Sequence, residues 1–215
     1  MSLRSLLLPF VGAVGIVAAG PRPFNIDRSH SEINFIAEAK FLDVHGFFDS
    51  FTVNVQFDPD TIAKSTVLIT IDPHYINTRV ARRDNHLKTC DFFCVDSFPA
   101  ITFQSRQVTR VGPDKYRIDG DLSMRGISKP MTVPARMVFN EPGGARFTGM
   151  FDINRHDFGI NGDGGGGIIN DSIHVEFNFT LRDPAMRRQG PPGPGGPGAP
   201  PAGTPTTPPA PPRGQ

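Results

Sequence analysis

The segment from Thr78 to Phe103 holds the residues whose types and spacing are best suited to chemistry. His86, Cys90 and Cys94 stand at positions i, i+4 and i+8, so on one continuous helix they would form a stripe of ligands suited to Zn²⁺ or Cu(I). Three ligands on one stripe are not the closed tetrahedral set of a structural zinc site, and the helix can end before Cys94. A Cys90–Cys94 disulfide, which closes a very small loop, and two buried thiols are the alternatives.

Three arginines in the same segment could bind an anion. Arg79, Arg82 and Arg83 fall in the first turns of the helix expected there, where the helix dipole disfavours cations. A phosphate or pyrophosphate headgroup nearby would account for them, because a guanidinium binds phosphate through a bidentate fork. A solvated charge run paired with neighbouring aspartates is the alternative. The other histidines are scattered, and their spacing assigns no nucleophile and base.

The elements that must position these residues are mainly β-strands. Apolar and polar residues alternate in many short runs, as expected for half-buried strands. These runs cover residues 24–27, 32–40, 51–57, 67–71, 101–105, 116–124, 131–139, 147–153 and 173–181. We interpret Asp43 to Gly46 as a turn, and residues 79–94 as a short helix that closes one end of a barrel, with Leu87, Cys90 and Cys94 facing inward.

About eight antiparallel strands, each with one apolar face, predict an all-β fold. Closure into a barrel removes exposed strand edges, although a sandwich of two sheets fits the periodicity nearly as well. A barrel of eight strands is either packed solid or holds one small ligand. The 18 phenylalanines, with no tryptophan and 2 tyrosines, suit an apolar interior. Gly120 and Gly149 fall in inward registers, where they either leave room for a cavity or mark a bulge.

The chain divides into three parts. Residues 1–20 have the layout of a secretory signal peptide: Arg4, an apolar run from Leu6 to Val17, and small residues at a cleavage site. A retained N-terminal anchor is the alternative. Residues 21–185 are long enough for one domain with its own core, and residues 186–215 form a Pro/Gly-rich tail predicted to be disordered. The formal net charge of +1 gives no reason to expect a nucleic-acid partner.

A resemblance to a known family rests on short motifs in family order from Phe24 to Asp183. They are Phe24-Asn-Ile-Asp27 with His30-Ser31, His45-Gly-Phe47 with Phe51, Thr78 with Arg83-Asp84-Asn-His86-Leu87, Asp91-Phe-Phe93, Phe98-Pro99, Thr102-Phe103 with Ser105, Gly120-Asp-Leu122, Arg125-Gly126 with Lys129, and Arg155-His-Asp-Phe-Gly-Ile160. On these residues the chain resembles the YceI-like family of exported bacterial lipocalin-like proteins, also called polyisoprenoid-binding proteins. Cys90 and Cys94, and the Pro-rich tail, depart from the family pattern.

The resemblance implies an eight-stranded antiparallel lipocalin-like barrel whose core holds a long isoprenoid or fatty chain. It implies a periplasmic or secreted carrier rather than a catalyst, with no cofactor besides the bound lipid and no integral membrane span after signal cleavage. A homodimer is compatible with such a barrel. The leading hypothesis is therefore a binding protein for a polyisoprenoid or an isoprenoid quinone. The alternatives are a metal-linked or redox protein using His86, Cys90 and Cys94, and a hydrolase or isomerase that acts on a bound lipid.

Two groups of residues are expected at the lipid site. The headgroup is expected near Arg83, together with Arg79, His30 and His45. The apolar chain is expected against inward-facing side chains of the strands, some of which could instead be ordinary core. These are Phe35, Phe51, Val53, Phe103, Leu122, Phe151, Phe177 and Phe179.

Overall fold

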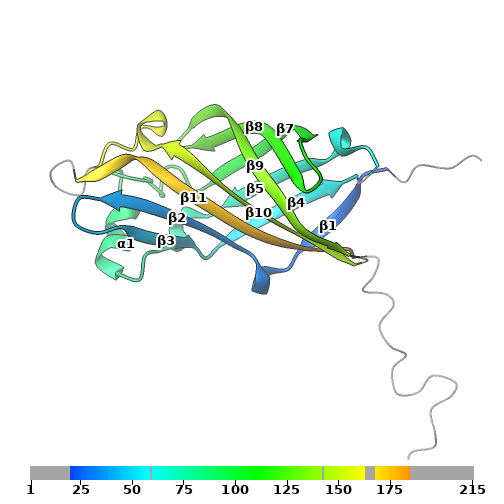
Figure 1. Ribbon diagram of the computed structural model, residues 1–215. Coiled ribbons are helices and arrows are strands. Elements are labelled where there is room, and N and C mark those ends of the chain that lie inside the picture. Colours follow the sequence, from blue (N-terminus) through cyan, green and yellow to red (C-terminus); the bar gives the residue numbers. More distant parts are fainter. Residues whose placement is uncertain (1–19, 59, 142, 163–167, 185–215) are drawn as a thin grey trace, which may run out of the picture.

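The computed structural model describes residues 20–58, 60–141, 143–162 and 168–184 (Figure 1). The predicted tail lies outside the described residues, and so does the predicted signal peptide apart from Gly20. The strands are β1 (Arg22–Ile26), β2 (Glu32–Ala39), β3 (Val44–Phe48), β4 (Phe51–Phe57), β5 (Thr66–Ile71), β6 (Ile76–Asn77), β7 (Ile101–Arg110), β8 (Lys115–Met124), β9 (Ile127–Glu141), β10 (Gly144–Asn154) and β11 (Ile169–Arg182). The helices are α1 (Ala81–Lys88) and the 3₁₀ turns η1 (Arg28–His30), η2 (Ile62–Lys64), η3 (Pro73–Tyr75) and η4 (Arg155–Phe158).

Eight strands close into an antiparallel barrel in the order β1-β4-β5-β7-β8-β9-β10-β11, with β11 pairing back to β1. The predicted barrel is thus confirmed, and the sandwich is not observed because β1 joins β4 to β11 and leaves no second sheet. β11 also pairs with β2, which carries β3 and then β6 as a side extension of the wall. None of the helices in the described part of the chain is long and apolar enough to cross a membrane.

The alternation predicted from the sequence sets which face of each strand is buried. In β4, the residues Phe51, Val53, Val55 and Phe57 are buried, whereas the three residues between them are exposed. Because a strand turns successive side chains to opposite faces, the same pattern around the barrel places a large apolar cluster inside it, with a smaller second cluster around Val108, Tyr116 and Ala135.

The predicted turn from Asp43 to Gly46 is wrong, because Val44 to Phe48 form strand β3. Gly46 lies directly across from Phe35 of β2, and a Cβ atom on Gly46 would stand 2.0 Å from the tip of the Phe35 ring. Gly46 therefore allows close packing within a strand. A glycine is equally compatible with a turn, so the residue type alone does not distinguish the two roles.

The two inward glycines do not enlarge the interior. A Cβ atom on Gly120 would stand 2.7 Å from the Phe103 ring, and one on Gly149 would stand 2.4 Å from the Phe177 ring. Aromatic rings already fill both positions, so the expectation that they leave room for a cavity is wrong. Gly120 faces the irregular register between β7 and β8, as the bulge alternative predicts.

The short helix is present but ends earlier than the predicted range. α1 stops at Lys88, and the following residues turn back beneath it, with Phe93 N–H donating to the Leu87 carbonyl at 3.0 Å. Cys94 has a left-handed backbone (φ 49°), so His86, Cys90 and Cys94 do not share one helical stripe. Figure 1 shows α1 and the β2–β3 hairpin at the same end of the barrel, opposite the end where β1 begins and β11 ends.

Candidate ligand-binding cavity

An apolar cavity of about 860 Å³ occupies the inside of the barrel. Strands β2 to β5 and β7 to β11 contribute its wall, and α1 contributes part of one end. The lining is almost entirely aliphatic and aromatic, because each strand turns its apolar face inward. Ser65, Tyr116, Arg82, Arg83, His86 and Arg155 are the polar or charged members, and the described lining includes no carboxylate.

The cavity is closed at one end and open at the other. At the closed end, away from α1, the lining residues Phe57, Val108, Tyr116, Ala135 and Leu181 are all buried. At the α1 end, Phe41, Leu42 and Val80 line the same cavity and are 80%, 61% and 46% exposed. A ligand therefore has a direct route between solvent and the interior beside α1 and the β2–β3 hairpin.

Arg82, Arg83 and His86 of the lining lie at the open end, on α1. Arg83 is held in place: its Nε donates to Thr78 Oγ1 at 2.8 Å and its Nη2 donates to the Thr78 carbonyl at 2.8 Å. Asp84 fixes Thr78 in turn, accepting from its backbone N–H at 2.8 Å and from its hydroxyl at 2.5 Å. Within the described part of the chain, Arg82 has no hydrogen-bond or ion-pair partner. This leaves its guanidinium available to an anion at the mouth.

Arg155 lines the cavity too, but its guanidinium is fully engaged by the protein. Its five N–H groups point at the carbonyls of Asn170, Ile160, Gly162 and Ile169 and at Asp171 Oδ1, at 2.7 to 3.3 Å. The residue is 6% exposed. Because no donor is left for a ligand, Arg155 is a structural cation that ties η4 to the start of β11.

Six of the eight predicted apolar residues line the cavity: Phe35, Phe103, Leu122, Phe151, Phe177 and Phe179. Phe51 and Val53 do not, although both face inward and are buried. The Arg28 guanidinium lies 3.7 Å from the centre of the Phe51 ring, and the Phe179 ring centre is 6.0 Å away. The interior is packed solid at this point, so Phe51 belongs to the core.

The four predicted headgroup residues are not brought together, and only Arg83 lines the cavity. Arg79 is exposed, with its guanidinium 5.0 Å from the Phe47 ring centre. His45 is exposed on the outward face of β3. His30 lies in η1, where its Nδ1 is 3.1 Å from Asp27 Oδ2. Hydrogen bonds from Arg182 and then from His30 hold the pKa of Asp27 below its usual value. His30 therefore pairs with Asp27 and does not face the cavity.

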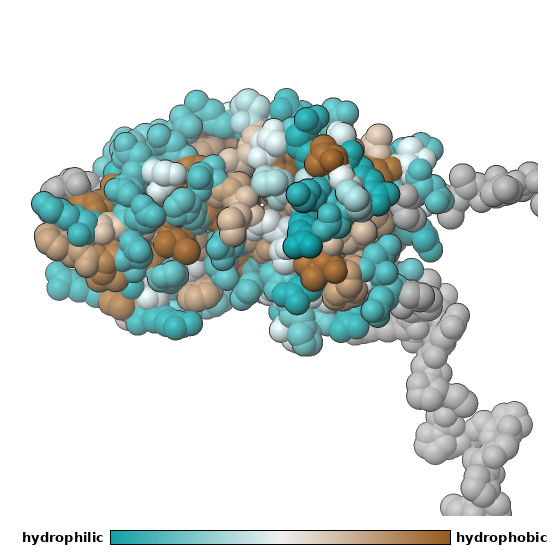
Figure 2. Space-filling view, in the orientation of Figure 1, coloured by the Kyte–Doolittle hydropathy of each residue, from teal (hydrophilic) through white to brown (hydrophobic). Residues whose placement is uncertain are grey.

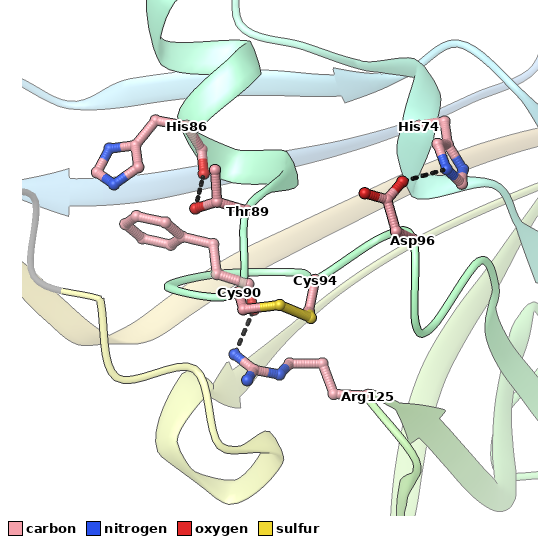
Figure 3. The surroundings of a disulfide bond; sticks show 8 residues. His74, His86, Thr89, Cys90, Cys94, Asp96 and Arg125 are labelled. Atoms are coloured by element: carbon pink, nitrogen blue, oxygen red, sulfur yellow. Dashed lines mark hydrogen bonds and ion pairs between the residues drawn. A yellow bond between two sulfur atoms is a disulfide. The ribbon is translucent and has the colours of Figure 1, made fainter.

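The metal or redox alternative is not favoured, because Cys90 and Cys94 are joined as a disulfide (Figure 3). Neither sulfur is then a thiolate ligand. His86 Nε2 lies 3.0 Å from Asp91 Oδ2 instead of facing the sulfurs. The described residues hold no cluster of three or more metal-binding side chains. Arg125 donates to the Phe92 carbonyl and so anchors the disulfide loop to the turn after β8.

Sequence reasoning missed several cavity residues at the mouth. The sequence does not single out Phe41, Leu42 and Val80. It places Arg82 among the arginines that could bind a phosphate headgroup but not in the final headgroup set, and it names His86 only as a candidate metal ligand. A signal did exist for the first two, because adjacent exposed apolar residues are unusual at the tip of a hairpin. The hairpin itself was hidden by the interpretation of residues 43–46 as a turn.

A closed antiparallel barrel with a deep apolar cavity and cations at its open end is a lipocalin-like binding barrel in architecture. The model of the YceI-like domain matches residues 24–181, and the chain belongs to the YceI-like family.

Relatives agree with this assignment, and solved structures share the fold. A UPF0312 protein of Vibrio cholerae is 28% identical over 179 residues, which is 76% of this chain and 95% of that protein. A UPF0312 protein of Staphylococcus aureus is 36% identical over 145 residues, covering 64% of this chain and 82% of its own length. The crystal structure of Burkholderia cenocepacia BcnA matches with a TM-score of 0.67 at 24% identity, over 73% of this chain and 99% of that one. A polyisoprenoid binding domain from Saccharophagus degradans matches with a TM-score of 0.61 at 13% identity, over 76% and 99%.

Proposed function

We propose that this protein binds one long-chain isoprenoid-type lipid, a polyisoprenoid or an isoprenoid quinone, and carries it in the periplasm or outside the cell. The observation that carries the proposal is the 860 Å³ apolar cavity, closed at one end and open beside α1. The likeness of the fold to a structure described as a polyisoprenoid binding domain agrees with it. The exported location rests on the signal-peptide pattern in residues 1–20.

The size of the cavity suits a chain of this length. At about 30 Å³ for a group the size of a water molecule, 860 Å³ corresponds to roughly 30 carbon-sized groups. Burial of twenty methylenes at about 0.8 kcal/mol each contributes about 16 kcal/mol. This exceeds the cost of association, which is about 4 to 15 kcal/mol. Chain length therefore supplies the affinity, and few specific contacts are needed inside.

The headgroup is proposed to lie at the α1 end. Arg82, Arg83 and His86 are the polar groups beside the opening. Arg83 is bonded to Thr78 and His86 is paired with Asp91, so Arg82 is the group available to a headgroup. An anionic or strongly polar headgroup would pair with Arg82 while the apolar tail extends toward Tyr116 at the closed end. Headgroup recognition then sets selectivity, because the tail site accepts any flexible apolar chain.

Binding without catalysis is the simplest function for this site. His86 Nε2 lies 3.0 Å from Asp91 Oδ2, and this pair does not in itself identify a reaction. The disulfide between Cys90 and Cys94 takes both sulfurs out of metal or thiol chemistry. A homodimer, which is compatible with such a barrel, would leave the proposal unchanged.

The test is native mass spectrometry of protein purified without detergent from its own host, followed by organic extraction and identification of any released lipid. A stoichiometric isoprenoid supports the proposal. Protein that carries no apolar ligand, and that does not bind added polyprenols or quinones, overturns it.

Arg82→Gln should weaken binding of a long chain with an anionic headgroup but not of the corresponding alcohol. Arg106→Gln, on the outer wall beside Asp121, is the matched control.

A further inference from the structure

The rim of the cavity exposes apolar side chains that the barrel has no structural reason to leave in water. Phe41 is 80% exposed, Leu42 61% and Val80 46%. All three also line the cavity, so they form one apolar surface that continues from its interior onto the outside of the molecule. We call these three residues the apolar rim.

Three cations, Lys40, Arg79 and Arg82, lie within two positions of an apolar-rim residue along the chain. Lys40 Nζ lies 5.8 Å from the centre of the Phe41 ring. Arg82 follows Val80 by two positions and is without a described ion-pair partner, and Arg79 is exposed beside Val80. Of the nearby acids, Asp84 is occupied by Thr78, and Asp43 next to Leu42 is exposed.

The apolar rim occupies the tip of the molecule. Its residues come from the β2–β3 hairpin and the segment entering α1, which lie together at the left-hand end of the barrel in Figure 1. In Figure 2 brown and teal residues alternate at this end, so hydrophobic and hydrophilic surfaces are mixed there. Two other exposed apolar residues lie away from the rim: Val111 is in the turn between β7 and β8 at the opposite end, and Met150 is on the outward face of β10.

Exposed aromatic and aliphatic side chains ringed by Lys and Arg are characteristic of surfaces that insert shallowly into an anionic bilayer. We propose that the apolar rim docks on an anionic phospholipid surface, with Phe41, Leu42 and Val80 entering the headgroup region and Lys40, Arg79 and Arg82 facing lipid phosphates. This proposal rests on the proposed function and adds the partner with which the lipid is exchanged.

A bilayer explains the continuity between rim and cavity better than a protein partner does. A long apolar chain that left the mouth into water would expose every methylene, at about 0.8 kcal/mol each. A mouth pressed against the bilayer lets the chain pass from one apolar phase to another without that exposure. The cations beside the mouth match the phosphates of such a surface.

The absence of tryptophan from the sequence allows a direct test. Phe41→Trp places a single tryptophan at the rim, and Val111→Trp places one at the far end as a matched control. Each variant is mixed with vesicles of phosphatidylcholine, with and without phosphatidylglycerol, at low and high salt. We expect a blue shift of emission, and quenching by brominated acyl chains, only for Phe41→Trp, and most strongly with phosphatidylglycerol at low salt.

Flotation with vesicles gives the second measurement. The double substitution Phe41→Ser with Leu42→Ser should lower the partition coefficient at least tenfold, because two large apolar side chains are lost from the interface. Arg82→Gln should lower it about fivefold on anionic vesicles and hardly at all on phosphatidylcholine. The matched control Met150→Ser should leave it unchanged.

Binding of a dispersed polyprenol, measured without vesicles, separates this proposal from the proposed function. If the ligand binds but neither tryptophan responds to vesicles, membrane docking is refuted and the binding function stands. If Phe41→Trp and Val111→Trp respond equally, adsorption is non-specific and docking through the rim is likewise refuted. If vesicles bind through the rim but no apolar ligand enters the cavity, the proposed function fails instead.

Discussion

Ala37 offers a way to block the cavity without weakening the barrel. It lies on the inward face of β2, in register with Val44 of β3 and Ile173 of β11, and all three side chains line the cavity. It also lies between the rim residue Phe41 and the deeper Ile33, so a chain that enters beside α1 must pass it. Ala37→Leu adds three carbon atoms at this point and displaces about the same number from the ligand.

Ala37→Leu should weaken ligand binding without lowering the stability of the ligand-free protein. Loss of three buried methylenes at about 0.8 kcal/mol each weakens ligand binding by about 2.4 kcal/mol, which is roughly fiftyfold in Kd. The free energy of unfolding of the ligand-free protein should stay constant or rise, because the new atoms fill existing empty space.

Two measurements check this, namely isothermal titration with a polyprenol and urea unfolding of the empty protein. Ala100→Leu adds the same atoms at an exposed position outside the cavity and should alter neither. For a ligand a few carbons shorter, the difference in affinity between the Ala37→Leu variant and the wild type should be smaller. Equal affinities of the two proteins for the long ligand would refute the assignment of the cavity as its site.

Three further changes test the framework around the cavity. Arg155→Met should lower the free energy of unfolding by roughly 3 to 5 kcal/mol in urea titrations, because it removes a buried cation and leaves its carbonyl acceptors unpaired; a loss below 1 kcal/mol, on the same scale, would contradict this structural role. Gly149→Ala should cost about 1 to 3 kcal/mol, since its Cβ would stand 2.3 Å from the Pro134 carbonyl oxygen and 2.4 Å from the Phe177 ring, and a thermally unchanged variant would show that both the β9 backbone and the ring move aside. The pKa of His174 is raised above its usual value of 6.5, chiefly by its hydrogen bond with Asp152. The protonated His174 therefore stabilises the fold fully at pH values below 6.5, and this stabilisation is lost as the pH rises through the raised pKa. The unfolding midpoint of His174→Gln should therefore lie below that of the wild type in acid and approach it in alkali, and a difference that did not vary with pH would count against the pair.

Local patterns were sufficient for most of the strands. The alternation in residues 51–57 predicts β4 to within a residue, because the side chains of a strand alternate regardless of what the strand packs against. The same pattern could not locate β3, since Gly46 gives room to the Phe35 ring of the paired strand β2 instead of forming a turn. It also could not fix the end of α1, which depends on the turn that brings Phe93 back to Leu87.

The sequence by itself determined the fold class, the family and the apolar character of the interior, because these follow from residue types and their short-range order. The tertiary structure alone decided which inward residues surround empty space. Phe35 and Phe51 have the same alternation, yet Phe35 lines the cavity and Phe51 is packed between Arg28 and Phe179. Likewise Arg83 reaches the mouth whereas His30 and His45 do not, since closure of β1 and β2 on β11 sets their positions. Contacts between residues distant in the chain distinguish a cavity wall from a core, and no periodicity along the sequence encodes them.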